Sequence, residues 1–175
     1  VYGKIHSEYG YLKKTINPLN FYALSKATVD YWVLDNMDRF EQVQGFRYFN
    51  VYGEGEEHKG DQASPISKFT KQAKETKIIK IFEDSEYAFR DFVCVDDIVD
   101  VVLDNTAGSG IYDVGTGNPI SFLEIAELIA KKEGAEIEVI PFPKHLEGKY
   151  QEYTCADTSW YSHDYTEVKH YLHTK

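Results

Sequence analysis

Four tyrosine–lysine pairs in this sequence are separated by four positions, a spacing that could support acid/base chemistry. They are Tyr9/Lys13, Tyr22/Lys26, Tyr165/Lys169 and Tyr171/Lys175. On a helix, residues four apart share one face, with about 5–6 Å between their β-carbons. A tyrosine hydroxyl, with an ordinary pKa of about 10, is a poor base at neutral pH, and a neighbouring ammonium group favours the phenolate. Spacing alone does not choose among the pairs, because a half-buried tyrosine beside a solvated lysine gives the same pattern.

The sequence around Tyr22 and Lys26 places this pair at the start of a helix. Asn17-Pro18 is a turn signal before it. From about residue 20 to residue 40, apolar residues recur at helical spacing, namely Tyr22, Ala23, Ala27, Tyr31, Leu34 and Met37. Residues 43–49 are rich in strand formers, and residues 50–53 close that strand. A helix followed by a strand indicates an α/β unit, so the context favours Tyr22 and Lys26 over the other pairs.

The rest of the chain continues to alternate between helices and strands. Asp96 or Asp97 can cap one helix, and Ser121 with Glu124 forms a capping-box pattern for another that stops at Gly134. We expect helices over residues 65–77, about 96–105 and 122–133, strands over 78–82, 92–95, 111–114 and 137–140, and one or two short helices at the end.

Composition argues against several classes of protein. The 175 residues, 42% of them hydrophobic, are enough for one ordinary domain with a buried core. A net charge of -10 argues against a nucleic-acid-binding surface, which needs clustered Lys and Arg. No apolar run approaches the ~20 residues that cross a bilayer, so we expect no membrane segment. The only cysteines, Cys94 and Cys155, form no disulfide framework, and with no signal peptide in view we expect a cytoplasmic protein.

Two further motifs are interpreted as structural. Only His170 and His173 lie close together among the six histidines, so no metal site is predicted. Gly115-Thr116-Gly117 lacks the third glycine of the dinucleotide-binding pattern and is interpreted as a tight turn between a strand and a helix.

Three sequence blocks carry a resemblance to a known enzyme family. They are Val1-Tyr2-Gly3, residues 17–26 (NPLNFYALSK) and residues 47–53 (RYFNVYG). Together with residues 90–98 and 114–117, they resemble the extended short-chain dehydrogenase/reductase family. The resemblance covers nearly the whole chain.

The resemblance implies an α/β fold with two parts. Residues 1–50 would be the carboxy-terminal remnant of a truncated, Rossmann-like, doubly wound dinucleotide-binding domain. Residues 51–175 would mainly form a smaller α/β substrate-binding lobe, with segments around 92–115 able to return to the Rossmann sheet. The family's Gly-rich loop and its catalytic Ser or Thr would precede Val1.

Within this family, further segments are similar to the ADP-L-glycero-D-manno-heptose 6-epimerase subgroup. They are residues 53–60 (GEGEEHKG), 82–85 (FEDS), 140–143 (IPFP) and 148–151 (GKYQ). The resemblance implies inversion at C6 of the heptose of ADP-D-glycero-D-manno-heptose, by transient oxidation and re-reduction with NADP, or alternatively NAD. It also implies a homo-oligomer, a pentamer in this subgroup.

Such a reaction suits two acid/base groups on opposite sides of the carbon, because each epimer presents its hydroxyl proton from a different direction. Carried over by position, these groups are Tyr22 and Lys59. Lys26 would hold the nicotinamide ribose and assist Tyr22, and Lys26, Val51 and Lys59 are expected to contact the cofactor.

The resemblance also assigns residues to the nucleotide sugar. They are Asn50, Asp61, Lys68, Phe82, Glu83, Asp84, Ser85, Arg90 and Tyr150. Arg90 has a physical reason of its own, because a planar guanidinium can bind diphosphate oxygens through two parallel hydrogen bonds. The structural alternatives are an ion pair of Arg90 with Asp91 or Glu86, a turn role for Asn50 and simple packing for Tyr150.

Two other functions are compatible with the sequence. A UDP-sugar 4-epimerase or a nucleotide-sugar dehydratase of the same family would use Tyr22 and Lys26 similarly but give Lys59 no chemical role. The chain could instead be a non-catalytic module that binds a sugar nucleotide.

Asp84 stands where close relatives tend to carry glycine.

Overall fold

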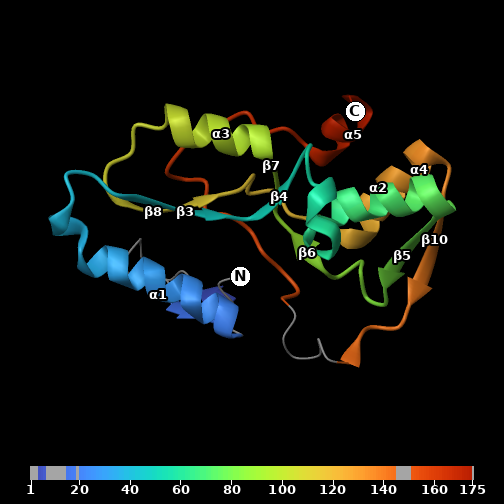
Figure 1. Ribbon diagram of the computed structural model, residues 1–175, viewed down its shortest axis with the longest axis horizontal. Helices are drawn as coiled ribbons and strands as arrows, with labels where there is room; N and C mark the ends of the chain where they lie inside the picture. The colour runs from blue at the N-terminus through green and yellow to red at the C-terminus, as the bar shows by residue number, and fades with distance from the viewer. Residues whose placement is uncertain (1–3, 7–14, 19, 145–150, 175) are drawn as a thin grey trace.

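The computed structural model describes residues 4–6, 15–18, 20–144 and 151–174 of the chain. Helices pack on small sheets in an elongated molecule with two groups of elements, one toward each end of its long axis (Figure 1). Two short antiparallel pairs are β1 (Lys4–His6) with β2 (Thr15–Asn17) and β6 (Phe89–Arg90) with β9 (Ile120–Ser121). In this described part of the chain, no helix has the length and apolar character needed to cross a bilayer. The alternation of helices and strands confirms the predicted α/β class.

The first group of elements surrounds a parallel pair, β3 (Gln44–Tyr48) and β8 (Gly110–Val114). Helices α1 (Phe21–Asp35) and α3 (Val95–Asp104) lie on opposite sides of this pair (Figure 1). All five residues of β8 are buried, as expected for a parallel strand covered on both faces. The strand predicted over 111–114 therefore pairs with the strand that follows α1.

Helix α1 is packed differently from its predicted apolar face. Ala23 and Ala27 are buried at 1% exposure each, whereas Tyr22 and Tyr31 are 60% and 50% exposed. The helix also ends before residue 40, and a separate 3-10 helix, η1 (Met37–Arg39), follows it. The predicted apolar face is therefore buried at its alanines and exposed at its tyrosines.

A second parallel pair, β4 (Asn50–Tyr52) and β7 (Phe92–Cys94), connects the two groups. The sequence predicts that residues 50–53 only end the strand before them. This is wrong, because residues 50–52 form a strand of their own that pairs with β7 from far along the chain. Phe92 and Cys94 belong to one hydrophobic cluster, and Val93 belongs to the other. Since successive side chains of a strand point to opposite faces, β7 contributes to both cores.

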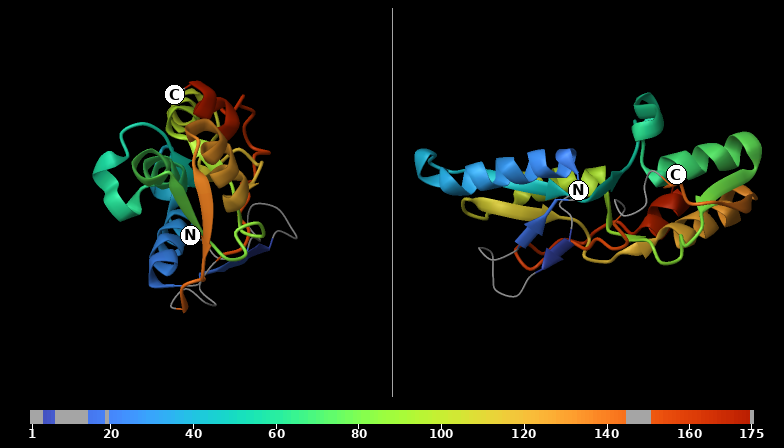
Figure 2. Two further views of the ribbon diagram at one scale, coloured as in Figure 1. Left: turned by 90° about the vertical axis from the view of Figure 1, so that its right-hand side faces the viewer. Right: turned by 90° about the horizontal axis from the view of Figure 1, so that it is seen from below.

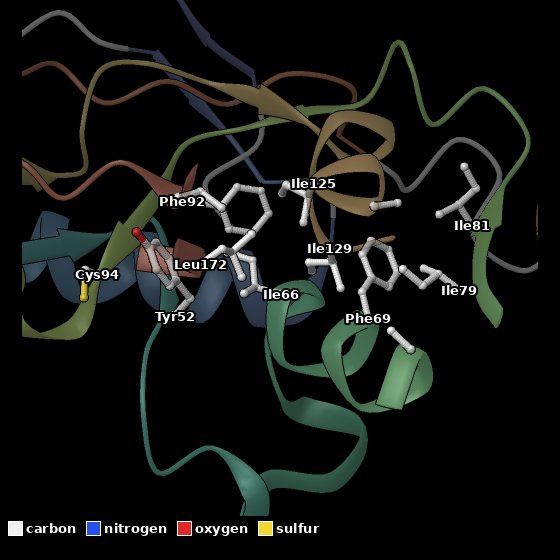
Figure 3. Packing of buried hydrophobic residues seen from close by; sticks show 13 residues of the cluster. Tyr52, Ile66, Phe69, Ile79, Ile81, Phe92, Cys94, Ile125, Ile129 and Leu172 are labelled. Atoms are coloured by element: carbon white, nitrogen blue, oxygen red, sulfur yellow. The ribbon is translucent and has the colours of Figure 1, made fainter. Parts of the chain in front are cut away.

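The second group packs two helices, α2 (Pro65–Thr76) and α4 (Phe122–Glu133), on the parallel pair β5 (Ile78–Phe82) and β10 (Glu136–Ile140). Helix α5 (Val168–Thr174) closes the same core. Figure 3 shows the apolar side chains that meet between these elements, among them Ile66, Phe69, Ile79, Ile81, Ile125, Ile129 and Leu172.

The ends of α4 are made by the residues that the sequence predicts, and the start of α2 is made by a serine that it did not single out. The Ser121 hydroxyl oxygen accepts a hydrogen bond from the Glu124 amide at 3.1 Å. Gly134 ends the helix at φ 61°, a left-handed conformation that suits glycine. Ser64 caps α2 in the same way through the Ser67 amide at 3.2 Å.

Two buried aspartates hold the segment before α5 against the rest of the molecule. The sequence predicts that Asp96 or Asp97 caps α3, but no side chain caps this helix, so that prediction is wrong. The Asp97 carboxylate instead accepts a hydrogen bond from the Thr166 amide at 2.8 Å. The Asp91 carboxylate, which is fully buried, accepts from the Ala156 amide at 2.9 Å and from the amides of residues 116–117 at 2.8 and 2.9 Å. The predicted tight turn is therefore present, and Asp91 holds it.

A buried cluster of charges joins α1, β3 and β8. The Arg47 Nε donates to Asp30 Oδ2 at 2.7 Å, and Arg47 Nη1 lies 3.5 Å from Asp113 Oδ1. Burial raises the pKa of Asp30, and the hydrogen bond from Arg47 opposes this rise. The Arg47 guanidinium thus pairs with two carboxylates, those of Asp30 and Asp113, which come from elements far apart in the sequence.

Candidate active site

The predicted pair Tyr22 and Lys26 lies on an exposed side of α1. Asn20 caps the helix by accepting a hydrogen bond from the Ala23 amide at 2.8 Å, which fixes the first turn that carries Tyr22. The Lys26 Nζ lies 5.3 Å from the centre of the Tyr22 ring. The ammonium is therefore adjacent to the phenol, as the proposed acid/base chemistry needs.

The other tyrosine–lysine pairs have no such arrangement among the described residues. Tyr165 precedes α5 and Lys169 lies within it, so they do not share a helical face. Burial, together with nearby carboxylates, raises the pKa of Tyr165 to about 12, which disfavours its phenolate. Tyr9, Lys13 and Lys175 lie outside the described residues.

Lys59 is carried by a short exposed 3-10 segment, η2 (Glu57–Gln62), between β4 and α2. Its backbone amide donates to the Glu56 carbonyl at 2.9 Å. Both views of Figure 2 place η2 on the same side of the molecule as α1. A common site for Lys59, Tyr22 and Lys26 stays a prediction.

Asn50 and Val51, predicted to contact substrate and cofactor, lie in β4. The Asn50 amide donates to the Asp91 carbonyl at 3.0 Å, and Val51 packs against the cluster around Val93 and Val114. The Val51 side chain is therefore partly buried against this core, and its contact with the cofactor stays a prediction.

Most of the predicted substrate residues line one cleft of about 1710 Å³ next to α2. They are Asp61, Lys68, Phe82, Glu83, Asp84 and Ser85. Drug-sized ligands occupy pockets of about 300–1,000 Å³, so this cleft has room for a nucleotide sugar. The structure thus brings together residues from η2, α2 and the turn after β5.

The cleft also contains aromatic residues that the site prediction did not include. The rings of Phe82 and Phe142 meet edge to face with their centres 5.7 Å apart. Phe122, at the start of α4, lines the same cleft. The run Ile140-Pro141-Phe142-Pro143 was a signal that could have identified Phe142, because it marks the end of β10 beside the turn after β5.

Arg90 lies beside the cleft, and its side chain is buried, with 8% of the residue exposed. Its guanidinium donates to the Phe89 carbonyl at 2.8 Å and to the Gln151 carbonyl, and it lies 5.6 Å from the centre of the Phe122 ring. Arg90 therefore borders the cleft through Phe122 and does not line it. Tyr150 lies outside the described residues, next to the Gln151 that contacts Arg90.

Asp84 occupies a left-handed conformation in the turn after β5, with φ 62°. For residues other than glycine this conformation brings the β-carbon close to the following carbonyl oxygen, although Asp tolerates it better than most. Its carbonyl accepts a hydrogen bond from the Tyr87 amide at 3.0 Å. The turn between Phe82 and Tyr87 thus forms despite a residue that strains it.

We expect Asp84→Gly to raise the free energy of unfolding by about 0.5–1 kcal/mol, because glycine adopts positive φ without a steric penalty. Urea denaturation of the chain measures this change. Asp84→Ala is the matched control, since it removes the same charge but keeps the β-carbon. If alanine stabilised the chain as much as glycine, relief of charge repulsion and not backbone strain would be the cause.

Comparison with known proteins identifies the family of the chain. A model of the NAD dependent epimerase/dehydratase family matches residues 1–115. The chain belongs to this family. The Rossmann-like α/β fold expected from the sequence is the fold of NAD dependent epimerases and dehydratases.

Several proteins similar to the chain share one name. The ADP-L-glycero-D-manno-heptose-6-epimerase of Alkalilimnicola ehrlichii is 45% identical over 152 residues, which cover 81% of this chain and 48% of that protein. The protein of the same name from Brachyspira hyodysenteriae is 44% identical over 164 residues, or 90% of this chain and 52% of that protein. The crystal structure of the Helicobacter pylori ADP-L-glycero-D-manno-heptose-6-epimerase matches with a TM-score of 0.68 and 31% identity, over 81% of this chain and 45% of that chain.

The chain spans about half the length of the curated relatives that it matches. It contains the helix with Tyr22 and Lys26, the segment with Lys59 and the cleft next to α2.

Proposed function

We propose that this chain forms the substrate-binding part of an ADP-L-glycero-D-manno-heptose 6-epimerase. The single observation that carries the proposal is the cleft, in which six of the nine residues assigned to the nucleotide sugar come together beside the segment with Lys59. The names of the similar proteins support the same substrate. Residues 1–50 would belong to the cofactor-binding part, and most of residues 51–175 to the substrate lobe.

The cleft has walls suited to an ADP-sugar. The edge-to-face pair Phe82 and Phe142 offers an apolar wall for the flat adenine ring. Lys68, on α2, lines the same cleft and would supply a cation for the phosphates. Ser85, whose hydroxyl donates to the Phe82 carbonyl at 2.6 Å, holds the turn in place.

The residues present fit one end of a nicotinamide cofactor. Tyr22 and Lys26 lie side by side on an exposed surface, and a phenol next to an ammonium is the donor set that a ribose hydroxyl and a reacting alcohol need. A bound nicotinamide cofactor would accept and return the hydride of C6. We propose NADP for this role, with Lys26 at the ribose and the backbone of Val51 beside the ring.

The chain's own residues would move the proton of the substrate hydroxyl. In one direction the Tyr22 phenolate, stabilised by the Lys26 ammonium, would take the proton of the C6 hydroxyl of one epimer as the hydride leaves C6. The Lys59 ammonium would donate a proton to the same oxygen from the opposite face as the hydride returns, which gives the other epimer. The reverse reaction exchanges these roles, and proton exchange with water resets Tyr22 and Lys59. Two acid/base groups are needed because inversion moves the hydroxyl to the other side of the carbon. Assembly as a homo-oligomer stays a prediction of the resemblance, and a cytoplasmic location stays a prediction of the sequence.

Titration of the chain with ADP tests the substrate half of this proposal. We expect saturable binding of ADP by isothermal titration calorimetry, with no competition from UDP. Phe82→Ala is expected to weaken ADP binding by about tenfold or more, because it removes one of the two rings that form the aromatic wall. Lys131→Met, at an exposed position on α4 outside the cleft, is the control and should leave the affinity unchanged.

Two results would contradict this assignment. Preference for UDP over ADP would favour a UDP-sugar enzyme of the same family. Binding of ADP that is unaffected by Phe82→Ala would place the nucleotide outside the cleft.

A further inference from the structure

The connection between β4 and α2 is almost entirely exposed, apart from one glutamate. In the stretch from Glu54 to Gln62, Glu56 is the one buried side chain, at 5% exposure. A buried carboxylate is costly unless hydrogen bonds satisfy it. The burial of Glu56 in so exposed a segment therefore needs a structural or functional reason.

Both oxygens of the Glu56 carboxylate accept backbone amides from the two ends of this connection. Oε1 accepts from the Gly53 amide at 3.2 Å, just after β4. Oε2 accepts from the Ser64 amide at 2.5 Å, just before α2. Bonds from a charged acceptor to backbone amides are stronger than neutral ones. The carboxylate thus closes the connection into a loop at its base.

Lys59 depends on this closure for its position. Its amide donates to the Glu56 carbonyl at 2.9 Å, so its backbone is tied to the residue that closes the loop. The rest of η2 contains a kink at Gly60, with φ 51° and ψ -121°, and its side chains are exposed. Since η2 has no buried side chain of its own, Glu56 is its link to the body of the molecule.

We propose that Glu56 is a positioning residue that fixes Lys59 for proton transfer. The inference rests on the proposed function, in which Lys59 is one of the two acid/base groups. Glu56 is not assigned to the substrate, because both of its oxygens are engaged by backbone amides. Its effect on the reaction passes through the backbone to Lys59.

The test is a double-mutant cycle in the full-length protein, with Glu56→Gln and Lys59→Met. Glutamine keeps the shape of the side chain but sets an amide donor against a backbone donor. We expect Glu56→Gln to lower kcat by about 10–100-fold, because a misplacement of about 1 Å can cost about 100-fold. The KM for the ADP-sugar should be little changed. In the Lys59→Met background, the same substitution should lower kcat by less than about threefold, because the two residues act as one unit.

Glu127→Gln, on α4, is the matched control, since it removes the same charge from an exposed position that does not line the cleft. It should change kcat by less than about threefold, as surface substitutions usually do. If Glu56→Gln does not fold, Glu56→Asp replaces it in the cycle, because it keeps the charge but is too short to reach both amides. In either variant, hydrogen exchange at residues 57–62 should be faster than in the wild type.

Three results overturn the proposal. An equal loss of kcat in both backgrounds would mean that Glu56 acts on folding and not through Lys59. Normal kcat in Glu56→Gln with an inactive Lys59→Met would remove the role of Glu56 and leave the proposed function intact. Normal kcat in Lys59→Met alone would remove the role of Lys59, and with it both proposals.

Discussion

Replacing Arg47 by methionine is expected to lower the free energy of unfolding of the chain by about 3–5 kcal/mol, because it leaves buried charges uncompensated. Arg47 is 8% exposed and contacts two carboxylates, Asp30 at 2.7 Å and Asp113 at 3.5 Å. Methionine fills a similar volume, so the loss reports the missing cation more than a cavity. Urea denaturation followed by circular dichroism measures it.

The pH dependence of this loss follows from the pKa of Asp30. Burial raises the pKa of Asp30 in the folded chain, and Arg47 opposes the rise, so the pKa should rise further in Arg47→Met. A carboxyl group whose folded pKa is above its unfolded pKa binds its proton more tightly when folded. The free energy of unfolding then falls as the pH rises between these two values. The destabilisation should therefore be larger near pH 7 than near about pH 4.

A rescue experiment distinguishes charge from packing. Adding Asp30→Asn to Arg47→Met removes one of the two unpaired charges and should recover part of the lost stability. Asp35→Asn, at an exposed position near the end of α1, is the matched control and should recover none. A loss in Arg47→Met that is independent of pH and is not relieved by Asp30→Asn would contradict the electrostatic explanation.

Local signals in the sequence predicted the elements whose causes are local. Strand β5 and the boundaries of α4 follow from residue types at neighbouring positions, such as Ser121 before the helix and Gly134 after it. Strand β4 could not be predicted in this way, because its pairing partner β7 lies about forty residues later in the chain. The inward face of α1 was predicted only in part for a similar reason, since the strand that it packs on, β8, comes from residues far away in the chain.

The candidate site shows the same division. The spacing of Tyr22 and Lys26 predicted that their side chains are adjacent, because residues four positions apart on a helix lie on the same face. The prediction that the cleft residues lie together came from the family resemblance, because no local sequence pattern connects η2 with the turn after β5. Glu56 was missed because nothing in a run of acidic loop residues shows which one is buried.

Lys59→Met in the full-length protein is expected to lower the rate of C6 epimerisation by about 10²–10⁴-fold, the usual contribution of a positioned acid/base group. Lys59 lies in the exposed segment η2, so the substitution should not alter the folded core. Lys131→Met is the matched control and should retain the wild-type rate. A Lys59→Met rate within about threefold of the wild type would contradict a two-base mechanism and favour a family enzyme that uses Tyr22 and Lys26 alone.

The central claim is that this chain belongs to an enzyme that inverts C6 of an ADP-heptose. The most direct measurement is the ratio of the two C6 epimers, by proton NMR, after the full-length protein is incubated with ADP-D-glycero-D-manno-heptose and NADP. We predict that both epimers appear with the wild type and that the starting epimer persists with Lys59→Met. An unchanged heptose with the wild type, in a preparation that interconverts UDP-glucose and UDP-galactose, would contradict the account.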